Sequence, residues 1–307
     1  MNIGLNAGLG RNATLTDLLT QIEKAEADGF PSTWVVSVSS HDALMLLALA
    51  GRQTKKIELG TAVVPTFPRH PVALAQQALT AQAASNNRFV LGIGLSHRVL
   101  IEDRLGLEFV KPILHMREYV SVLNGVLTGQ LTEFLGKQYR VKTQLIVPGA
   151  SAPPILIAAL GPQMLKLAGT LASGTIVWMG GQKYLAGTAV PLISKAAREA
   201  NRPAPRIVAG LPIMVTNKTD AARATASKNY ALYGTLPSYR AILDIEGASD
   251  PAQVAIIGDE AHVEKQLRDL ASAGVTDFNA SLFEIGDDPG ARERTYQFLA
   301  RLTKNGV

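Results

Sequence analysis

Residues 57–98 form the stretch that most restricts how this chain can fold. Its first part, 57–64, is apolar and rich in β-branched residues, and the three prolines between 65 and 71 prevent regular strand pairing until a helix can begin. Pro71 occupies the expected first helical position, helical spacing of apolar residues follows, and a second apolar run occupies 88–93. The pattern predicts a right-handed βαβ unit, whose two strands have their carboxyl ends on the same side.

The same alternation of short apolar runs with helical patterns continues along all 307 residues, without a change of composition that would divide them. Strands are expected at 2–6, 32–37, 57–64, 88–93, 155–159, 174–179, 207–215 and 275–282. Eight such units predict an α/β fold, a (β/α)8 TIM barrel in one domain over 1–307, with its site at the carboxyl ends of the strands. Insertions are expected near 130–150, as a hairpin, and near 218–258, as additional helix.

Composition excludes several classes of function. The net charge is +5, but basic and acidic residues are interspersed, which disfavours a nucleic-acid partner. The longest uncharged stretch, 143–165, holds four prolines and predicts no membrane helix, and the amino terminus lacks a leader pattern, so a cytoplasmic protein is expected. There is no cysteine, and the five histidines lack metal-ligand spacing, so no metal site is expected.

Two loops at predicted strand ends hold candidate functional residues. Gly92 and Gly94 begin an incomplete dinucleotide fingerprint, in which His97 stands at the third glycine position, so a glycine-lined barrel loop is the simpler interpretation. His97 is a candidate proton donor or acceptor, with a solvent-facing loop histidine as the alternative. Gly161 and Pro162 follow a predicted buried strand and begin a helix. The free amides of this helix start can bind an anion, and the alternative is that the two residues only connect a strand to a helix.

The order of several short motifs along the chain resembles the bacterial luciferase-like monooxygenase superfamily, and most of all its branch that uses the deazaflavin coenzyme F420. The motifs are GTAVV at 60–64, RHP at 69–71, NRFVLGIG at 87–94, ALGPQMLKLAG at 159–169 and AGVTDF at 273–278. Each motif is weak alone, but their order over residues 3–298 is fairly specific.

The resemblance implies an oxidoreductase that passes a hydride between C5 of F420 and a small organic substrate. It implies a cis peptide bond at Ala62-Val63, behind the cofactor ring. Where relatives carry a loop carboxylate after the fourth strand, this chain has His97. The cofactor contacts carried over by position are Ala62, Val63, Gly94, Leu95, Ser96, Ala158, Ala159, Leu160, Gly161 and Pro162. The positions expected to face the substrate are Ser37, Trp178 and Met179. Tyr230, Tyr233 and Tyr239 are expected to form a lid or simply to pack.

The chain departs from the family where sugar-phosphate-oxidising relatives carry an Asp-His pair, because Ser37 and Val38 occupy those positions. Oxidation of a sugar hemiacetal is therefore not expected, whereas cofactor binding rests on backbone and shape. Two alternatives stay open: a monooxygenase that uses flavin mononucleotide (FMN), and a barrel that binds a flavin or deazaflavin without catalysis. The strongly apolar helix expected at 42–54, together with that at 71–85, predicts a homodimer.

Overall fold

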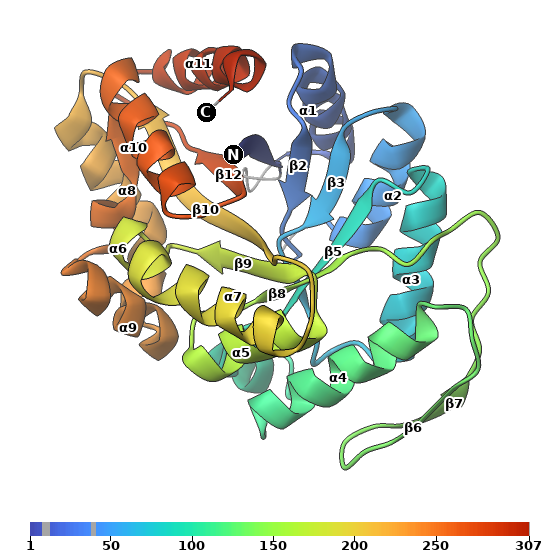
Figure 1. The fold of residues 1–307 in the computed structure, drawn as a ribbon. Helices are drawn as coiled ribbons and strands as arrows, with labels where there is room; N and C mark the ends of the chain where they lie inside the picture. The colour runs from blue at the N-terminus through green and yellow to red at the C-terminus, as the bar shows by residue number, and fades with distance from the viewer. Residues whose placement is uncertain (8–12, 38–40, 307) are drawn as a thin grey trace.

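The computed structural model describes residues 1–7, 13–37 and 41–306. Its centre is a closed barrel of eight parallel strands, because β10 pairs with both β9 and β12, and β12 pairs with β1 (Figure 1). In spatial order the barrel strands are β1 (Asn2–Ala7), β2 (Ser32–Val35), β3 (Glu58–Thr61), β5 (Phe89–Gly94), β8 (Ile155–Ala158), β9 (Gly174–Trp178), β10 (Arg206–Val215) and β12 (Asp277–Leu282). The predicted α/β barrel is confirmed.

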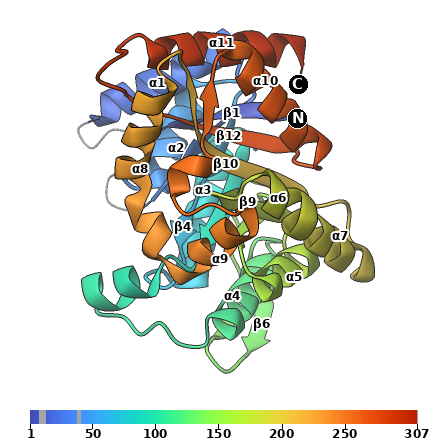
Figure 2. The same cartoon turned by 90° about the vertical axis from the view of Figure 1, so that its left-hand side faces the viewer.

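Helices surround this barrel and cover the outer face of its strands (Figure 2). They are α1 (Leu15–Asp28), α2 (Ala43–Gln53), α3 (Pro71–Ala84), α4 (Pro112–Val126), α5 (Pro162–Leu171), α6 (Gln182–Tyr184), α7 (Val190–Glu199), α8 (Thr219–Thr235), α9 (Pro237–Glu246), α10 (Glu260–Ser272) and α11 (Ala291–Asn305). Pro71 is the first residue of α3, as predicted, and the His70 side chain accepts a hydrogen bond from the Val72 amide. No helix in the described part of the chain is long and apolar enough to cross a membrane.

Two segments of the chain add elements to the eight barrel strands. Near 130–150, β6 (Thr132–Leu135) and β7 (Arg140–Thr143) form an antiparallel hairpin outside the barrel. Between β10 and β12, the chain forms α8, α9, a 3-10 turn at Pro251–Val254, the short strand β11 (Ile256–Gly258) and α10. The sequence had not predicted β11, which pairs with the carboxyl end of β10.

Two further details differ from the predicted elements. The strand expected at 57–64 is divided into β3 and the short β4 (Val64–Pro65), with a cis peptide bond at Ala62-Val63 between them. The loop after β5 contains a single π-helical turn at Leu100–Arg104. Neither feature has a periodicity that propensity rules detect.

The amino-terminal end of the barrel is closed by an ion-pair cluster. Arg206, the first residue of β10, binds Glu58 at 2.6 Å and Asp277 at 2.7 Å. Above this cluster, Trp34 fills the barrel with Val90, Leu156, Ile176 and Val208. With one end filled in this way, the side chains and loops free to contact a ligand are those at the carboxyl ends of the strands.

Candidate active site

The residues predicted to hold the cofactor come together after β3, β5 and β8. A Cβ atom added to Gly94 would lie 2.7 Å from Val63 Cγ2 and 3.1 Å from the Ala158 Cβ, so only glycine fits there. Three segments far apart in the sequence thus meet at one point of the barrel rim. Gly94 itself is buried, whereas Ala62, Val63 and Ala158 are half-buried, so these three residues are the part of the set that a flat ring can contact.

The Ala62-Val63 segment has the geometry that the resemblance implied, including its cis peptide bond. The Ala62 amide donates to the Val35 carbonyl at 2.7 Å, which holds this segment beside the end of β2. The Ser37 amide donates to the Val63 carbonyl at 3.4 Å, so Ser37 lies next to the same segment. Its neighbour Val38, the second position of the missing Asp-His pair, is outside the described residues.

The turn after β8 leads directly into α5. Gly161 precedes the helix in an extended conformation, and Pro162 is its first residue. Both are exposed, no described side chain caps the helix, and a Cβ added to Gly161 would meet no described atom within 4 Å. Ala159 in the same run is buried in the core, so the accessible part of the predicted set is Ala158, Leu160, Gly161 and Pro162. An open helix start favours an anionic group.

His97 lies after β5, where Leu95 and Ser96 are also half-buried. Ser96 has a φ of 61°, in the left-handed region, so the chain turns sharply just before the histidine. The His97 ring packs edge-on against Tyr239 of α9 at 5.6 Å. Burial lowers the pKa of His97 below its usual 6.5, so the imidazole is neutral at pH 7 and able to accept a proton.

The predicted substrate-facing residues of β9 have different environments. Trp178 is half-buried and its ring contacts Tyr230 and Tyr233 of α8, each at 5.9 Å. Met179 has a φ of 59° and is fully buried in the hydrophobic core. The tyrosines of the insertion therefore lie against the carboxyl end of β9, and Trp178, rather than Met179, is the accessible residue of this pair.

Two asparagines that sequence reasoning missed also lie near this end of the barrel. Asn6 is near the end of β1 and Asn279 is within β12, where it is 2% exposed. Within the described residues, the Oδ1 atoms of both are buried without a hydrogen-bond partner. The available signal was an amide side chain inside an apolar strand, in NIGLNA and DFNASL.

His115 has a structural role. His115, on α4, stacks on Phe67 at 4.0 Å and contacts Thr66 and Tyr139 through its two ring nitrogens. Burial lowers its pKa to about 4, so it packs as a neutral ring at pH 7. No group of three or more potential metal ligands occurs in the part of the chain that the structure describes.

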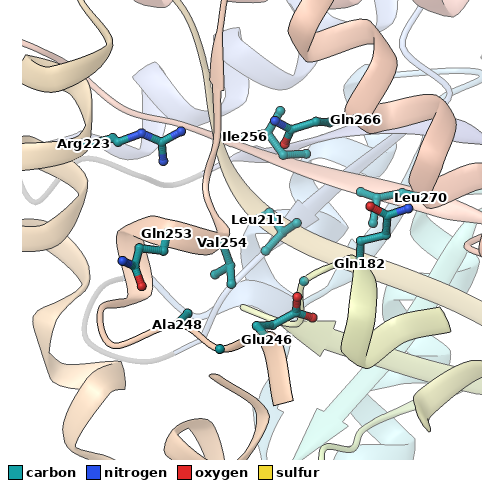
Figure 3. Close-up of a pocket in the computed structure, with 12 residues that line it drawn as sticks. Gln182, Leu211, Arg223, Glu246, Ala248, Gln253, Val254, Ile256, Gln266 and Leu270 are labelled. Carbon is teal, nitrogen blue, oxygen red and sulfur yellow. The ribbon is translucent and has the colours of Figure 1, made fainter. Parts of the chain in front are cut away.

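A cavity of about 550 Å³ lies elsewhere, between β10, α6, α10 and the insertion (Figure 3). Leu211 lines it, and side chains alternate along a strand, so it faces the outer side of β10, opposite to Gly210. Figure 3 shows Arg223 on one side of the cavity and Gln182 on the other. Its size is that of a ligand site, but the residues predicted for catalysis do not line it, so we place the reaction at the barrel rim.

Comparison with known proteins gives matches along nearly the whole chain. The family model described as "Luciferase-like monooxygenase" matches residues 2–298. The F420-dependent glucose-6-phosphate dehydrogenase of Nakamurella multipartita is 28% identical over 281 residues, which are 86% of this chain and 77% of that protein.

Two solved structures have the same fold. The coenzyme F420-dependent tetrahydromethanopterin reductase of Methanopyrus kandleri superposes with a TM-score of 0.79 at 22% identity, over 98% of this chain and 97% of that one. The oxygenating constituent of 3,6-diketocamphane monooxygenase of Pseudomonas putida, in complex with FMN, superposes with a TM-score of 0.79 at 16% identity. This match covers 100% of this chain and 98% of that one. At these identities the structures establish the fold alone.

Proposed function

The chain belongs to the luciferase-like monooxygenase family, and from this premise we propose that it is a coenzyme F420-dependent oxidoreductase that transfers a hydride between deazaflavin C5 and a small organic substrate. The observation that carries the proposal is the contact of Val63, Gly94 and Ala158 beside an open helix start. This arrangement offers a flat surface for a ring and, at Gly161, an uncapped helix start for a phosphate. Among the sequence relatives, those with F420 in their names favour the deazaflavin over FMN.

When bound, the deazaflavin supplies a carbon centre that accepts or donates a hydride. The residues of this chain supply the remaining requirements. Val63, Gly94 and Ala158 hold the ring against the barrel rim, and the amides at the start of α5 bind the phosphate. His97 accepts the substrate proton during oxidation and returns it during reduction, while Tyr239 covers its ring and limits the access of water.

The decisive experiment is a titration of the purified protein with F420 and, separately, with FMN. We expect a dissociation constant in the micromolar range or below for F420, and binding of FMN at least tenfold weaker. Turnover is then tested with reduced and oxidised F420 against a panel of alcohols, carbonyl compounds and enones. Tight FMN binding with oxygen-dependent turnover would favour the monooxygenase alternative, and F420 binding without any turnover would favour the non-catalytic one.

The role of His97 predicts a specific pH dependence. In the direction of substrate oxidation, kcat should be constant near pH 7 and fall as the pH drops below about 6.5, because a protonated imidazole no longer accepts a proton. His97→Gln should lower kcat by roughly 10²- to 10⁴-fold and abolish this acid limb. An acid limb that persists unchanged in His97→Gln would assign the titration to another group.

The same proposal includes a homodimer that forms through α2 and α3. Met45 and Leu49 lie four residues apart on α2, so they share one face of the helix, and they are 69% and 46% exposed. An apolar stripe of this kind is typical of a subunit interface. Sedimentation at micromolar concentration should give the mass of a dimer, and Met45→Glu together with Leu49→Glu should give a monomer. A monomeric parent protein contradicts this assignment.

A further inference from the structure

The inner barrel wall formed by β9, β10 and β12 carries polar and aromatic side chains, unlike the small side chains at the predicted cofactor contacts. There, Gly210 of β10 is paired in register with Trp178 of β9 on one side and Asn279 of β12 on the other. A Cβ added to Gly210 would lie 2.9 Å from the Trp178 ring and 3.7 Å from Asn279 Nδ2. Because Gly210 has no side chain, its two neighbours project side by side from the inner wall.

Asn6 extends this set to the neighbouring strand. Gly4 of β1 is in register with Asn279, and side chains alternate, so Asn6 projects from the same inner face one step nearer the carboxyl end. Tyr230 of α8 reaches this wall as well, with its hydroxyl 3.4 Å from the Ser281 hydroxyl of β12. We call Asn6, Trp178, Asn279 and Tyr230 the amide wall.

The amide wall holds three of the four buried side-chain polar atoms that lack a hydrogen-bond partner within residues 1–7, 13–37 and 41–306. These are Oδ1 of Asn6, Oδ1 of Asn279 and Nε1 of Trp178. Burial raises the pKa of Tyr233, and the Trp178 indole lies near enough to that hydroxyl to lower it by a side-chain hydrogen bond, so the two asparagine oxygens are the atoms that remain without a partner. An unpaired buried polar group destabilises the fold, so two amide oxygens of this kind in one patch indicate a partner that binds there.

The surroundings of the amide wall are aromatic and uncharged. Ring contacts connect Phe283 to Tyr230, Tyr230 to Trp178, Trp178 to Tyr233, Tyr233 to Tyr239 and Tyr239 to His97, at 4.8 to 6.4 Å. Burial raises the pKa of Tyr230 and Tyr239, so both are neutral phenols at pH 7. The side chains of the wall and of this aromatic series are amides, phenols, an indole, a phenyl ring and the neutral imidazole of His97, so none of them is charged at pH 7.

We propose that Asn6 and Asn279 are specificity-determining residues that bind the end of the substrate remote from the reacting carbon, and that the substrate is an uncharged ring compound with a second hydroxyl or carbonyl group at that end. A primary amide both donates and accepts hydrogen bonds, so it recognises either group. The aromatic series packs against the ring of the substrate. None of the four side chains of the amide wall carries a charge, so none of them compensates the desolvation of a phosphate or carboxylate. This inference rests on the proposed function.

The test uses three matched probes: cyclohexanone, 4-hydroxycyclohexanone and 4-oxocyclohexanecarboxylate. With reduced F420 as the hydride donor for reduction of the ketone, 4-hydroxycyclohexanone should have a KM at least tenfold lower than cyclohexanone, and the carboxylate should be the poorest substrate. Asn279→Leu should raise the KM for the hydroxyketone tenfold or more, to about that of cyclohexanone, while leaving the KM for cyclohexanone and the F420 affinity unchanged. Asn6→Leu should have the same pattern with a smaller effect.

Stability provides a second readout that separates ligand recognition from a structural role. Asn279→Leu removes a buried amide oxygen that lacks a partner, so its melting temperature should equal or exceed that of the parent protein. A fall in melting temperature, with the preference for the hydroxyketone intact, would show that the amide pairs with an internal water molecule and would overturn the inference. A preference for the carboxylate probe would overturn it as well.

Binding without cofactor distinguishes failure of this inference from failure of the proposed function. Hydroxyketone binding is measured by quenching of tryptophan fluorescence in the cofactor-free protein, with Trp178→Phe identifying the reporting residue. Quenching that depends on Asn279 supports the amide wall even if F420 does not bind. F420 turnover with no effect of Asn279→Leu on any probe refutes the amide wall and leaves the proposed function in place.

Discussion

The helices that follow β8 and β9 begin side by side at the same end of the barrel, but the backbone amides of their first turns have different hydrogen-bond partners. At the start of α6, the Glu246 carboxylate accepts hydrogen bonds from the backbone amides of Tyr184 at 2.6 Å and Lys183 at 3.3 Å. At the start of α5, no described side chain caps the helix, and Gly161 faces open space. The protein satisfies one helix start with its own anion and leaves the adjacent one for an anion from solution.

The glycines at the two helix starts show the same contrast. A Cβ added to Gly181 would lie 2.6 Å from the Glu246 carboxyl carbon, so glycine is required for the carboxylate to approach. A Cβ added to Gly161 meets nothing among the described atoms, so glycine there is not required by the packing of the chain itself. One glycine accommodates a side chain of the protein, whereas the other leaves room for a ligand.

The largest effect on stability should follow from removing the carboxylate that caps the start of α6. Glu246→Ala removes a charged acceptor from two amides and should lower the free energy of unfolding by about 2–3 kcal/mol, with F420 affinity unchanged. Urea denaturation measures the first quantity and a fluorescence titration the second. Glu246→Gln keeps one acceptor oxygen and should lose about half as much. Equal stability of Glu246→Ala and the parent protein would contradict the assigned hydrogen bonds.

The opposite change adds a capping carboxylate at the uncapped start of α5. Gly161→Asp introduces a capping carboxylate, which should raise the free energy of unfolding by about 1 kcal/mol and weaken F420 binding at least tenfold, because the carboxylate competes with the phosphate. Gly161→Asn is the matched control, since it caps the helix without charge and should keep F420 affinity within about threefold. Unchanged F420 affinity in Gly161→Asp would show that the phosphate lies elsewhere.

A smaller effect is expected from the contact that connects the two starts. The Tyr184 hydroxyl, at the start of α6, donates to the Leu160 carbonyl, in the turn before α5, at 2.6 Å. Tyr184→Phe should lower the free energy of unfolding by about 1 kcal/mol and accelerate amide hydrogen exchange in residues 159–165. Exchange rates equal to those of the parent protein would mean that this hydrogen bond does not order the turn.

Most of the barrel was predictable because the signals that specify it are local. Proline at the first position of α3 and short β-branched runs each act within a few residues, and each is found where predicted. The contact of Val63 with Gly94 and Ala158 followed from the resemblance rather than from any periodicity. His97 lies in the loop after β5, at the carboxyl end of a barrel strand, and its proton-transfer role stays a prediction.

The features that were not predicted depend on partners distant in sequence. Glu246 is 62 residues from Tyr184, and nothing in either segment indicates that a carboxylate at the end of one helix will cap another. Asn6 and Asn279 come from the first and last barrel strands, so their proximity exists only once the barrel has closed. Local rules also missed the π-helical turn at Leu100–Arg104, because its hydrogen bonds leave no distinct sequence pattern.

Closure of the barrel between β1 and β12 also determines when the protein can fold during its synthesis. Asn2 and Asp277 are 275 residues apart in sequence and are paired in the finished sheet. At translation rates of about 5–20 residues per second, β1 therefore waits roughly 15 to 55 seconds for its partner strand. During that interval one edge of the nascent sheet has unpaired backbone groups, so we expect the newly made chain to depend on chaperones until its last strand has been translated.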